Sequence, residues 1–340
     1  MTRIALDLMG GDHAPASVVD GALLVASEQP DVSVVLVGPP DLAEGLLTER
    51  GHAGAFEVVA ASQVITMDED PAHGIRAKRD ATVRVCARLV RDGQADAMVS
   101  VGSTGAALAA GLLTLGRLKG ISRPPLAAVV PARNGPLIFL DAGANPESSV
   151  SLLAQYALAG SAFATIRLGI AEPRVGLLTN GEEAGKGDAV RKEAYDVLAG
   201  LPINFIGSVE GRDVPYGGAA DVIVTDGFTG NVLIKGLEGA AAMLTDILMA
   251  AMTSTPEHKA AAKELLPAFV EATAYMSPDE LGGAVLLGVD GVCVVGHGSS
   301  SPRAVASCVR AAAQAAREGL VPKIAASLSE LVDRRARVDT

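Results

Sequence analysis

Short apolar runs alternate with alanine-rich stretches of helical length along most of the chain. The runs are apolar at successive positions, which is typical of strands that are covered on both faces. Strands are expected at 4–8, 33–37, 97–101, 126–130, 137–140, 175–178, 204–206 and 222–225, and helices at 104–119, 150–167 and 188–198. This alternation predicts an α/β fold with a doubly wound, mainly parallel sheet.

The segment 237–277 departs from this alternation, because it is mostly helical in pattern and has no strand signal. Thr255 has the side chain of an N-cap and precedes Pro256, so we expect a helix to begin there. Many apolar side chains lie on both sides of this point. The pattern by itself favours a helical pair packed on the core or on a second subunit over an amphipathic element at a membrane surface.

The composition narrows the class of protein. The 340 residues include 28 basic and 39 acidic side chains, for a formal net charge of −11, and 49% are hydrophobic. Such a chain is not disordered, and its acidic balance argues against a nucleic-acid-binding protein. We expect a single catalytic domain over 1–335, which includes the helical segment 237–277.

Three features predict a cytoplasmic location. The uncharged stretch 97–116 has too many glycine and hydroxyl residues for a transmembrane helix, and the first residues lack the apolar region of a signal peptide. The cysteines Cys86, Cys293 and Cys308 form neither a zinc motif nor a disulfide framework.

Five apolar runs end in glycine-rich polar turns, at 7–13, 100–105, 141–145, 179–187 and 225–231. Loops at the carboxyl ends of the strands of a doubly wound sheet meet in one crevice, where glycine lets backbone N–H groups approach a ligand. Together the turns favour an anion or phosphate site over simple turns.

The turns do not match the standard nucleotide motifs. None has the GxGxxG arrangement of a dinucleotide site, and the stretch from Gly181 to Lys186 is one residue short of a P-loop. Gly187 also stands where a P-loop has the Ser or Thr that holds magnesium. We therefore expect neither NAD nor ATP as a cofactor.

Three side chains in these turns are suited to stabilising an anion. Lys186 either reaches a ligand from its small-residue loop or is a solvated lysine. Asn145 and Asn231 either donate an N–H to a developing oxyanion or serve as turn and cap residues.

The remaining candidates are two histidines and three carboxylates. His13 and His297 lie in polar, glycine-flanked turns, where each is a candidate acid, base or anion ligand, or a structural histidine. Asp12, Asp141 and Asp226 lack the spacing of metal ligands, so no metal is expected. No serine or cysteine has the sequence context of a covalent nucleophile.

A cluster of basic residues stands out on this acidic chain, and its members are Arg76, Lys78, Arg79, Arg84, Arg88 and Arg91. The last three are spaced to share one helix face. The cluster is either a solvated surface or a docking site for an acidic partner.

Taken in order, these motifs resemble the PlsX family, the acyl-ACP:phosphate acyltransferases of bacterial phospholipid synthesis. The resemblance runs from Ile4 to about Ala325 and is carried by 5–15, 102–106, 141–145, 181–187, 225–235 and 296–300. The sequence departs from the family pattern at three places. These are Leu8, Ser103, where the family has asparagine, and 80–82, where the family has a polar run.

The resemblance implies a fold like that of isocitrate and isopropylmalate dehydrogenases, related to phosphotransacetylase, and usually a homodimer. It implies transfer of a long acyl chain from acyl carrier protein to inorganic phosphate, without a cofactor. The acyl phosphate then passes to a membrane glycerol-3-phosphate acyltransferase.

The resemblance also changes two interpretations. It makes 237–277 a candidate for reversible, peripheral membrane contact, which reverses the preference drawn from the pattern alone. It makes Arg76, Lys78 and Arg79 a candidate dock for the acidic carrier protein.

The chemistry of this transfer needs few groups. Phosphate is already a nucleophile, and a thiol with a pKa of roughly 8.5 leaves without strong acid assistance. The protein must hold two anions together and stabilise an oxyanion, a task that we assign to Lys186 and Asn231. Contacts to phosphate and substrate are expected from Asp12, His13, Ser103, Thr104, Asn145, Thr229, Gly230 and His297, with Thr104, Asn145 and His13 helping to seat the phosphate.

Two rival functions remain open. One is a phosphotransacetylase that uses a short acyl-CoA, from which a long apolar acyl channel would distinguish this protein. The other is a non-catalytic module that binds acyl lipid or carrier protein at the membrane surface.

Overall fold

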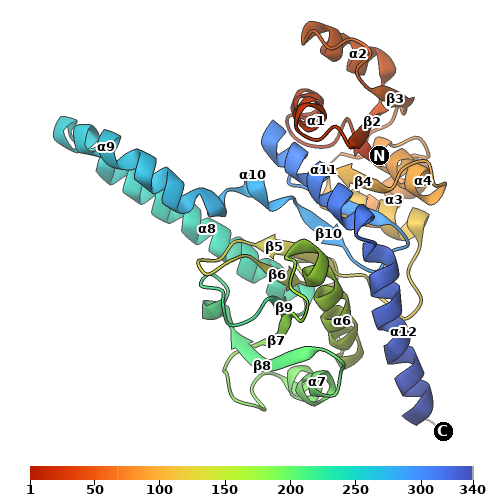
Figure 1. Ribbon diagram of the computed structural model, residues 1–340, viewed down its shortest axis with the longest axis vertical. Coiled ribbons are helices and arrows are strands. Elements are labelled where there is room, and N and C mark those ends of the chain that lie inside the picture. The colour runs from red at the N-terminus through yellow and green to blue at the C-terminus, as the bar shows by residue number, and fades with distance from the viewer. Residues whose placement is uncertain (67, 339–340) are drawn as a thin grey trace.

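The computed structural model describes residues 1–66 and 68–338. In this part of the chain eleven strands form one sheet, in the order β3-β2-β1-β4-β11-β10-β5-β6-β9-β7-β8 (Figure 1). The strands are β1 (Thr2–Asp7), β2 (Val32–Gly38), β3 (Glu57–Ala60), β4 (Ala97–Ser100), β5 (Leu126–Val130), β6 (Leu137–Leu140), β7 (Arg174–Thr179), β8 (Asn204–Glu210), β9 (Val222–Val224), β10 (Ala284–Leu286) and β11 (Val292–Val295).

Helices cover both faces of the sheet. They are α1 (Ala16–Glu28), α2 (Pro40–Glu49), α3 (Pro71–Ala77), α4 (Thr82–Arg91), α5 (Thr104–Ala110), α6 (Val150–Arg167), α7 (Ala189–Ala199), α8 (Gly227–Met252), α9 (Pro256–Thr273), α10 (Pro278–Leu281), α11 (Pro302–Arg317) and α12 (Leu320–Val338). Shorter helical turns are η1 (Gly111–Leu115), η2 (Gly211–Asp213) and η3 (Ala274–Met276).

The sheet is mainly parallel, as predicted. Seven of its ten pairings within the described residues are parallel, and the antiparallel ones join β10 to β11, β10 to β5 and β5 to β6. The strand direction therefore reverses within the sheet. The carboxyl ends of β1, β4 and β11 lie at one edge, and those of β6, β7 and β9 lie at the opposite edge.

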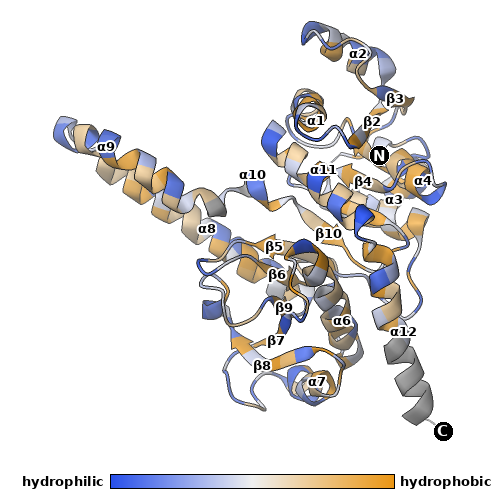
Figure 2. Cartoon of the chain, in the orientation of Figure 1, coloured by the Kyte–Doolittle hydropathy of each residue, from blue (hydrophilic) through white to orange (hydrophobic). Residues whose placement is uncertain are grey.

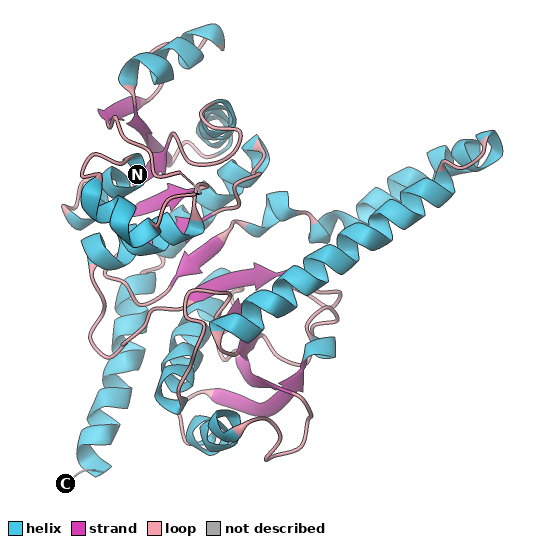
Figure 3. Cartoon of the chain, turned by 180° about the vertical axis from the view of Figure 1, so that it is seen from behind, coloured by secondary structure: helices cyan, strands magenta, loops and turns pink. Residues whose placement is uncertain are grey.

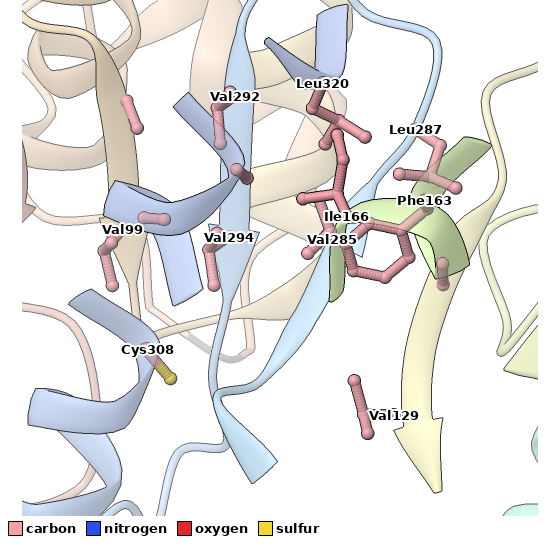
Figure 4. Close-up of a cluster of buried hydrophobic side chains, with 14 of the residues drawn as sticks. Val99, Val129, Phe163, Ile166, Val285, Leu287, Val292, Val294, Cys308 and Leu320 are labelled. Atoms are coloured by element: carbon pink, nitrogen blue, oxygen red, sulfur yellow. The ribbon is translucent and has the colours of Figure 1, made fainter. Parts of the chain in front are cut away.

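Alternating side chains of each strand enter different cores. Ile4 and Leu6 join a cluster that runs along one face beneath α1, α6, α11 and α12, whereas Ala5 faces the other side. Figure 4 shows part of the first cluster, where Phe163 and Ile166 of α6 lie near Val285. This burial on both faces explains why the strand sequences are apolar at successive positions.

The opposite face of the sheet has two separate cores. One lies beneath α4 and α5 and includes Leu126 at the start of β5. The other lies beneath the beginning of α8, where Leu233 and Leu237 pack, and it is joined by Val130 at the end of β5. The hydrophobic core on this face is therefore split into two parts at β5, which lies between the two halves of the sheet.

Helices α8 and α9 form a hairpin that projects away from the sheet (Figures 1 and 3). Thr255 caps α9 by accepting a hydrogen bond from the His258 N–H, as predicted. Both helices contain many hydrophobic residues (Figure 2), and several of these side chains are exposed, with Ile247 57% and Leu265 61% exposed. The interpretation that this segment packs on the core is therefore wrong for the chain as described here.

Two other helix boundaries differ from the prediction. The helix expected over 104–119 ends at Leu115, because Gly116 adopts a φ of 84° that a right-handed helix cannot continue. Helix α8 begins at Gly227, inside the turn expected at 225–231, because Asp226 caps it. No helix in residues 1–66 and 68–338 is long and apolar enough to span a membrane.

Candidate active site

The glycine-rich turns form two groups, because the strand direction reverses in the sheet. The turns after β1, β4 and β11 contact one another, and those after β6, β7 and β9 make a second set of contacts. The expectation that all five turns meet in one crevice is therefore wrong. The turns gather at two places, at opposite ends of the strands.

In the second group, Asp141 organises the turn after β6. Its side chain is fully buried and accepts hydrogen bonds from the N–H groups of Leu126, Gly143, Ala144 and Asn145, at 2.8–3.1 Å. A carboxylate surrounded by donors in this way has a structural role and is not free to hold a metal.

Asn145 completes the same turn. Its Nδ2 donates to Asp141 Oδ2 at 2.8 Å and to the Pro124 carbonyl at 2.9 Å. Both amide protons are therefore engaged within the protein. The prediction that Asn145 donates to phosphate would require one of these bonds to be exchanged.

The beginning of α8 lies directly against this turn. The Gly227 N–H donates to the Asn145 carbonyl at 2.8 Å, and a Cβ on Gly230 would lie 2.0 Å from the Asp141 carbonyl oxygen. Glycine at position 230 is needed for this close approach. Asn231 follows it, with an exposed side chain, and a Cβ on Gly143 would lie 3.4 Å from the Asn231 Cβ.

Asp226 fixes the first turn of α8. Its carboxylate accepts from the Thr229 N–H and the Thr229 hydroxyl, both at 2.8 Å, and from Arg191 Nη2. Burial acts to raise the pKa of Asp226, but the hydrogen bonds from Thr229 and Arg191 outweigh it and lower the pKa. Asp226 is therefore an ionised helix cap.

Lys186 lies in the loop between β7 and α7. The Gly187 N–H donates to Asn180 Oδ1 at 2.9 Å, and Gly185 and Gly187 have φ values of 86° and 94°. The Lys186 side chain is 51% exposed, and its Nζ lies 3.8 Å from the Glu183 carboxylate. This long, exposed contact leaves the ammonium able to turn toward a ligand.

Arg191 connects this loop to α8, a role that the sequence pattern did not indicate. Besides Asp226, its guanidinium donates to the Leu178 carbonyl at 3.0 Å, Asp188 at 2.6 Å and the Thr225 hydroxyl at 3.1 Å. The available signal was weak, since an arginine three residues after a capping aspartate is common on solvated helices.

In the first group, Asp7 and Ser100 lie at the ends of β1 and β4. The Ser100 hydroxyl donates to Asp7 Oδ2 at 2.7 Å, and both side chains are buried. The Asp12 N–H donates to the Gly298 carbonyl at 2.8 Å, which joins the first turn of the chain to the turn after β11.

The predicted residues of this group differ in exposure. Asp12, His13, Thr104 and His297 are exposed, and His297 Nδ1 lies 2.8 Å from the Ser299 hydroxyl. Ser103 is half-buried and caps α5 by accepting from the Ala106 N–H at 3.4 Å. Serine and asparagine are both favourable N-caps, so Ser103 can cap α5 where the family has asparagine.

The basic cluster is partly used for structure. Lys78 Nζ donates to Glu69 at 2.5 Å and to the Val64 carbonyl at 2.7 Å, while Arg84 and Arg88 donate to backbone carbonyls of α3 and its C-terminal flank. Arg76 and Arg79 are exposed. Of the predicted dock, these two side chains remain accessible.

The described residues contain no group of three His, Cys, Asp or Glu side chains that could hold a metal ion. The three cysteines are buried and free.

Comparison with known proteins identifies the family. The family model described as "Fatty acid synthesis protein" matches residues 2–323. The chain belongs to this family, which is the PlsX family. A phosphate acyltransferase of Desulfitobacterium hafniense (strain Y51) is 45% identical over 324 residues, which are 95% of this chain and 96% of that protein.

A second relative extends over nearly the whole chain. The phosphate acyltransferase of Acidobacterium capsulatum is 43% identical over 338 residues, which are 99% of this chain and 100% of that protein. The family member described here is thus an enzyme, a phosphate acyltransferase of fatty acid and phospholipid synthesis.

Solved structures share the fold. A phosphotransacetylase from Streptococcus pyogenes superposes with a TM-score of 0.62 at 18% identity, covering 94% of each chain. The EutD phosphotransacetylase from Staphylococcus aureus gives 0.60 at 18% identity, covering 93% of this chain and 94% of that one. The predicted relation to the phosphotransacetylase fold is confirmed, and the likeness to the dehydrogenases stays a prediction.

Proposed function

We propose that this family member transfers a long-chain acyl group from acyl carrier protein to inorganic phosphate. A phosphate oxygen attacks the thioester carbonyl carbon, the C–O bond forms, and the C–S bond breaks. The products are acyl phosphate and the free carrier thiol. We infer that residues 1–335 form one catalytic domain.

One observation carries the proposal. Lys186 and Asn231 are both exposed, and Arg191 ties the elements that hold them into one unit. Within the described residues the Asn231 side chain makes no hydrogen bond, and the Lys186 ammonium has only its distant contact with the Glu183 carboxylate. A cation and an amide held in this way can stabilise the oxyanion of the tetrahedral intermediate without being released from strong partners.

The phosphate subsite is proposed beside these residues. Thr229 and Gly230 lie in the first turn of the 26-residue helix α8, where the Thr229 N–H and hydroxyl and the Gly230 N–H donate to Asp226, so phosphate contact there requires some of these bonds to be exchanged. Asn145 is proposed to help seat the phosphate there. His13 and Thr104, predicted as phosphate contacts, lie with Asp12, Ser103 and His297 in the first group of turns, where these side chains are proposed to contact the substrates. Proximity of the two reactants then supplies much of the rate.

Carrier docking is proposed at Arg76 and Arg79, supported by Lys78. The chain has a net charge of −11, so it repels an acidic protein over most of its surface. Exposed arginines at the end of α3 offer a local positive surface that orients such a partner.

The hairpin α8–α9 is proposed as the element of homodimer and membrane contact. Its exposed apolar side chains include Met243, Leu244, Ile247, Leu265 and Val270, at 56–61% exposure. An apolar surface of this kind marks an interaction site. We infer a cytoplasmic enzyme that touches the membrane transiently, where its product would be used by a glycerol-3-phosphate acyltransferase.

The test is an assay of long-chain acyl-ACP with and without inorganic phosphate, with acyl phosphate trapped by hydroxylamine as the hydroxamate. We expect hydroxamate and free carrier thiol only when phosphate is present. Turnover with short acyl-CoA but not with acyl-ACP would indicate a phosphotransacetylase. No product from either donor would favour the alternative that the protein is a non-catalytic binding module.

A matched pair of variants tests the site. Lys186→Met should lower turnover by about 10²- to 10³-fold, the effect typical of losing one group that stabilises an oxyanion. Lys192→Met removes an exposed lysine from α7 and should retain turnover. Equal turnover in the two variants would exclude Lys186 from the chemistry.

A further inference from the structure

A pocket of about 420 Å³ lies outside both groups of glycine-rich turns. Its volume is within the range of roughly 300–1,000 Å³ that is typical of sites for small molecules. The second half of α11 forms most of its wall, and α10 and the C-terminal ends of α1 and α6 form the rest. The lining residues are Gln29, Arg167, Glu280, Ser307, Arg310, Ala311, Gln314, Arg317 and Glu318.

The position of this pocket in the fold separates it from the proposed site of acyl transfer. Helices α1, α6 and α11 each begin shortly after a glycine-rich turn, and the pocket lies toward their C-terminal ends. Helix α6 has 18 residues and is therefore about 27 Å long. Arg167, at its C-terminal end, is thus remote from the turn of Asp141, which precedes its N-terminal end.

Arg167 leaves most of its hydrogen-bonding capacity unused. A guanidinium has five N–H donors, and among the described residues Arg167 uses Nη2 to donate to the Leu281 carbonyl at 3.3 Å. Its Nε is buried without a partner, and no carboxylate in this part of the chain pairs with it. Burial lowers the pKa of Arg167, because it disfavours the charged form. An anion bound beside this cation would offset that cost.

The other two arginines of the pocket already have acceptors. Arg310 donates to Glu28 at 2.8 Å and to the Ser307 hydroxyl at 2.6 Å, and Arg317 lies 2.7 Å from the Asp31 carboxylate. The C-terminal end of a helix also favours a cation, which applies to Arg167 as well. That effect supplies no acceptor for the buried Nε, so the fold accounts for Arg310 and Arg317 but not for Arg167.

The remaining lining residues limit the class of ligand. Glu280 and Glu318 line the same pocket, so a ligand with several negative charges would be repelled. These carboxylates accept hydrogen bonds from hydroxyl groups, and the amides of Gln29 and Gln314 suit polar groups. Among the described residues that line the pocket, only Ala311 is apolar. The ligand therefore combines one anionic group with hydroxyl groups and has little apolar surface.

We propose that this pocket binds a small hydroxylated metabolite that carries a single carboxylate or phosphate group. The anionic group accepts hydrogen bonds from Arg167, whose planar guanidinium suits either oxyanion. Hydroxyl groups of the ligand donate to Glu280 or Glu318. The ligand then bridges α6, α10 and α11, beside the segment that returns from the α8–α9 hairpin to the sheet. This site is separate from the proposed acyl transfer and does not depend on it.

Isothermal titration calorimetry in phosphate-free buffer tests the site with three small probes, which are glycerol 3-phosphate, glycerate and glycerol. We expect at least one of the two anions to bind the wild type, and we expect uncharged glycerol not to bind. The anion that binds more tightly identifies the recognised group as phosphate or carboxylate.

Variants locate the bound anion. Arg167→Met should weaken its binding by about tenfold or more, the effect typical of losing hydrogen bonds to a charged group. Arg303→Met removes an exposed arginine of α11 outside the lining and should bind like the wild type. Gln29→Trp narrows the pocket from the end of α1 and should also weaken binding, so it decides the test if Arg167→Met does not fold. Lys186→Met should leave this binding unchanged.

Three results would overturn the inference. Absence of binding by either anion at millimolar concentration would show that the pocket is not a site for this class of ligand. Equal affinity in the wild type, Arg167→Met and Gln29→Trp would place the anion elsewhere on the protein. Loss of binding in Lys186→Met, with wild-type affinity in Arg167→Met, would assign the anion to the proposed phosphate subsite.

Discussion

Arg191 Nη2 donates to the carboxylate of Asp226, and this ion pair joins helix α7 to the N-terminus of helix α8. The two side chains are only 14% and 13% exposed. Because Arg191 also binds Asp188 at the start of α7, one guanidinium holds the Lys186 loop against the helix that carries Asn231. The geometry of the proposed oxyanion site therefore depends on a residue that need not touch the substrate.

Replacing Arg191 should destabilise the protein. Arg191→Met leaves the Asp226 carboxylate without its charged partner in a mostly buried position, so we expect the free energy of unfolding to fall by about 2 kcal/mol. Urea denaturation measures this change. Arg212→Met is the matched control, because Arg212 is 71% exposed where it pairs with Glu182 and Glu210, and its loss should cost much less. Equal losses in the two variants would contradict the structural role of Arg191.

The same ion pair predicts a loss of stability in acid. The pKa of Asp226 is lowered in the folded state from 3.8, so its stabilising contribution is present above 3.8 and is lost as the pH falls through the lower, folded value. Asp226→Asn should remove that part of the pH dependence. The free energies of unfolding of the two proteins should differ most above 3.8 and converge in stronger acid. A constant difference at all pH values would rule out this linkage.

The cysteines should be unreactive in the native protein. Burial raises the pKa of Cys293 and of Cys308 to about 12, and it also raises that of Cys86. Thiolate is the reactive form, so iodoacetamide at about pH 8 should label none of them until the protein unfolds. Mass spectrometry should then find three labels. Rapid labelling of the folded protein would show that the core around one of the thiols opens readily.

A charge on the hairpin should change its interactions and not its folding. Ile247 is 57% exposed, so Ile247→Glu should shift the free energy of unfolding by less than about 0.5 kcal/mol. It should weaken self-association in sedimentation experiments or binding to phospholipid vesicles in flotation experiments. Thr245→Glu places the same charge at an exposed polar residue of α8 and is the control. Wild-type behaviour of Ile247→Glu in both assays would show that the hairpin mediates neither self-association nor membrane binding.

Much of the fold follows from local pattern. The eight expected strands and the helix over 150–167 are present, because each strand is apolar on both faces and Ser149 caps its helix. Strands β3, β10 and β11 were missed, because they have only three or four residues each. The two halves of the sheet run in opposite directions because β5 and β6 are antiparallel, since β10 is antiparallel to both of its neighbours and leaves β5 parallel to β11. Both β5 and β6 were expected as strands, but the direction of their pairing was not predicted.

The site was predictable only in part. Glycine-rich turns marked where Lys186 and Asn231 would lie, since close backbone approach, such as that of Gly230 to Asp141, requires glycine. The network behind them was not visible in the sequence. Asp141 and Arg191 act through partners that are distant in the chain, and only the packed structure brings those partners together.

The central claim is tested most directly with radiolabelled inorganic phosphate and long-chain acyl-ACP. The account predicts that labelled acyl phosphate and free carrier thiol appear at the same rate and in equal amounts, and that both are greatly reduced in Lys186→Met. Release of carrier thiol without label in an acyl product would mean that water is the acceptor and would contradict phosphate acyl transfer.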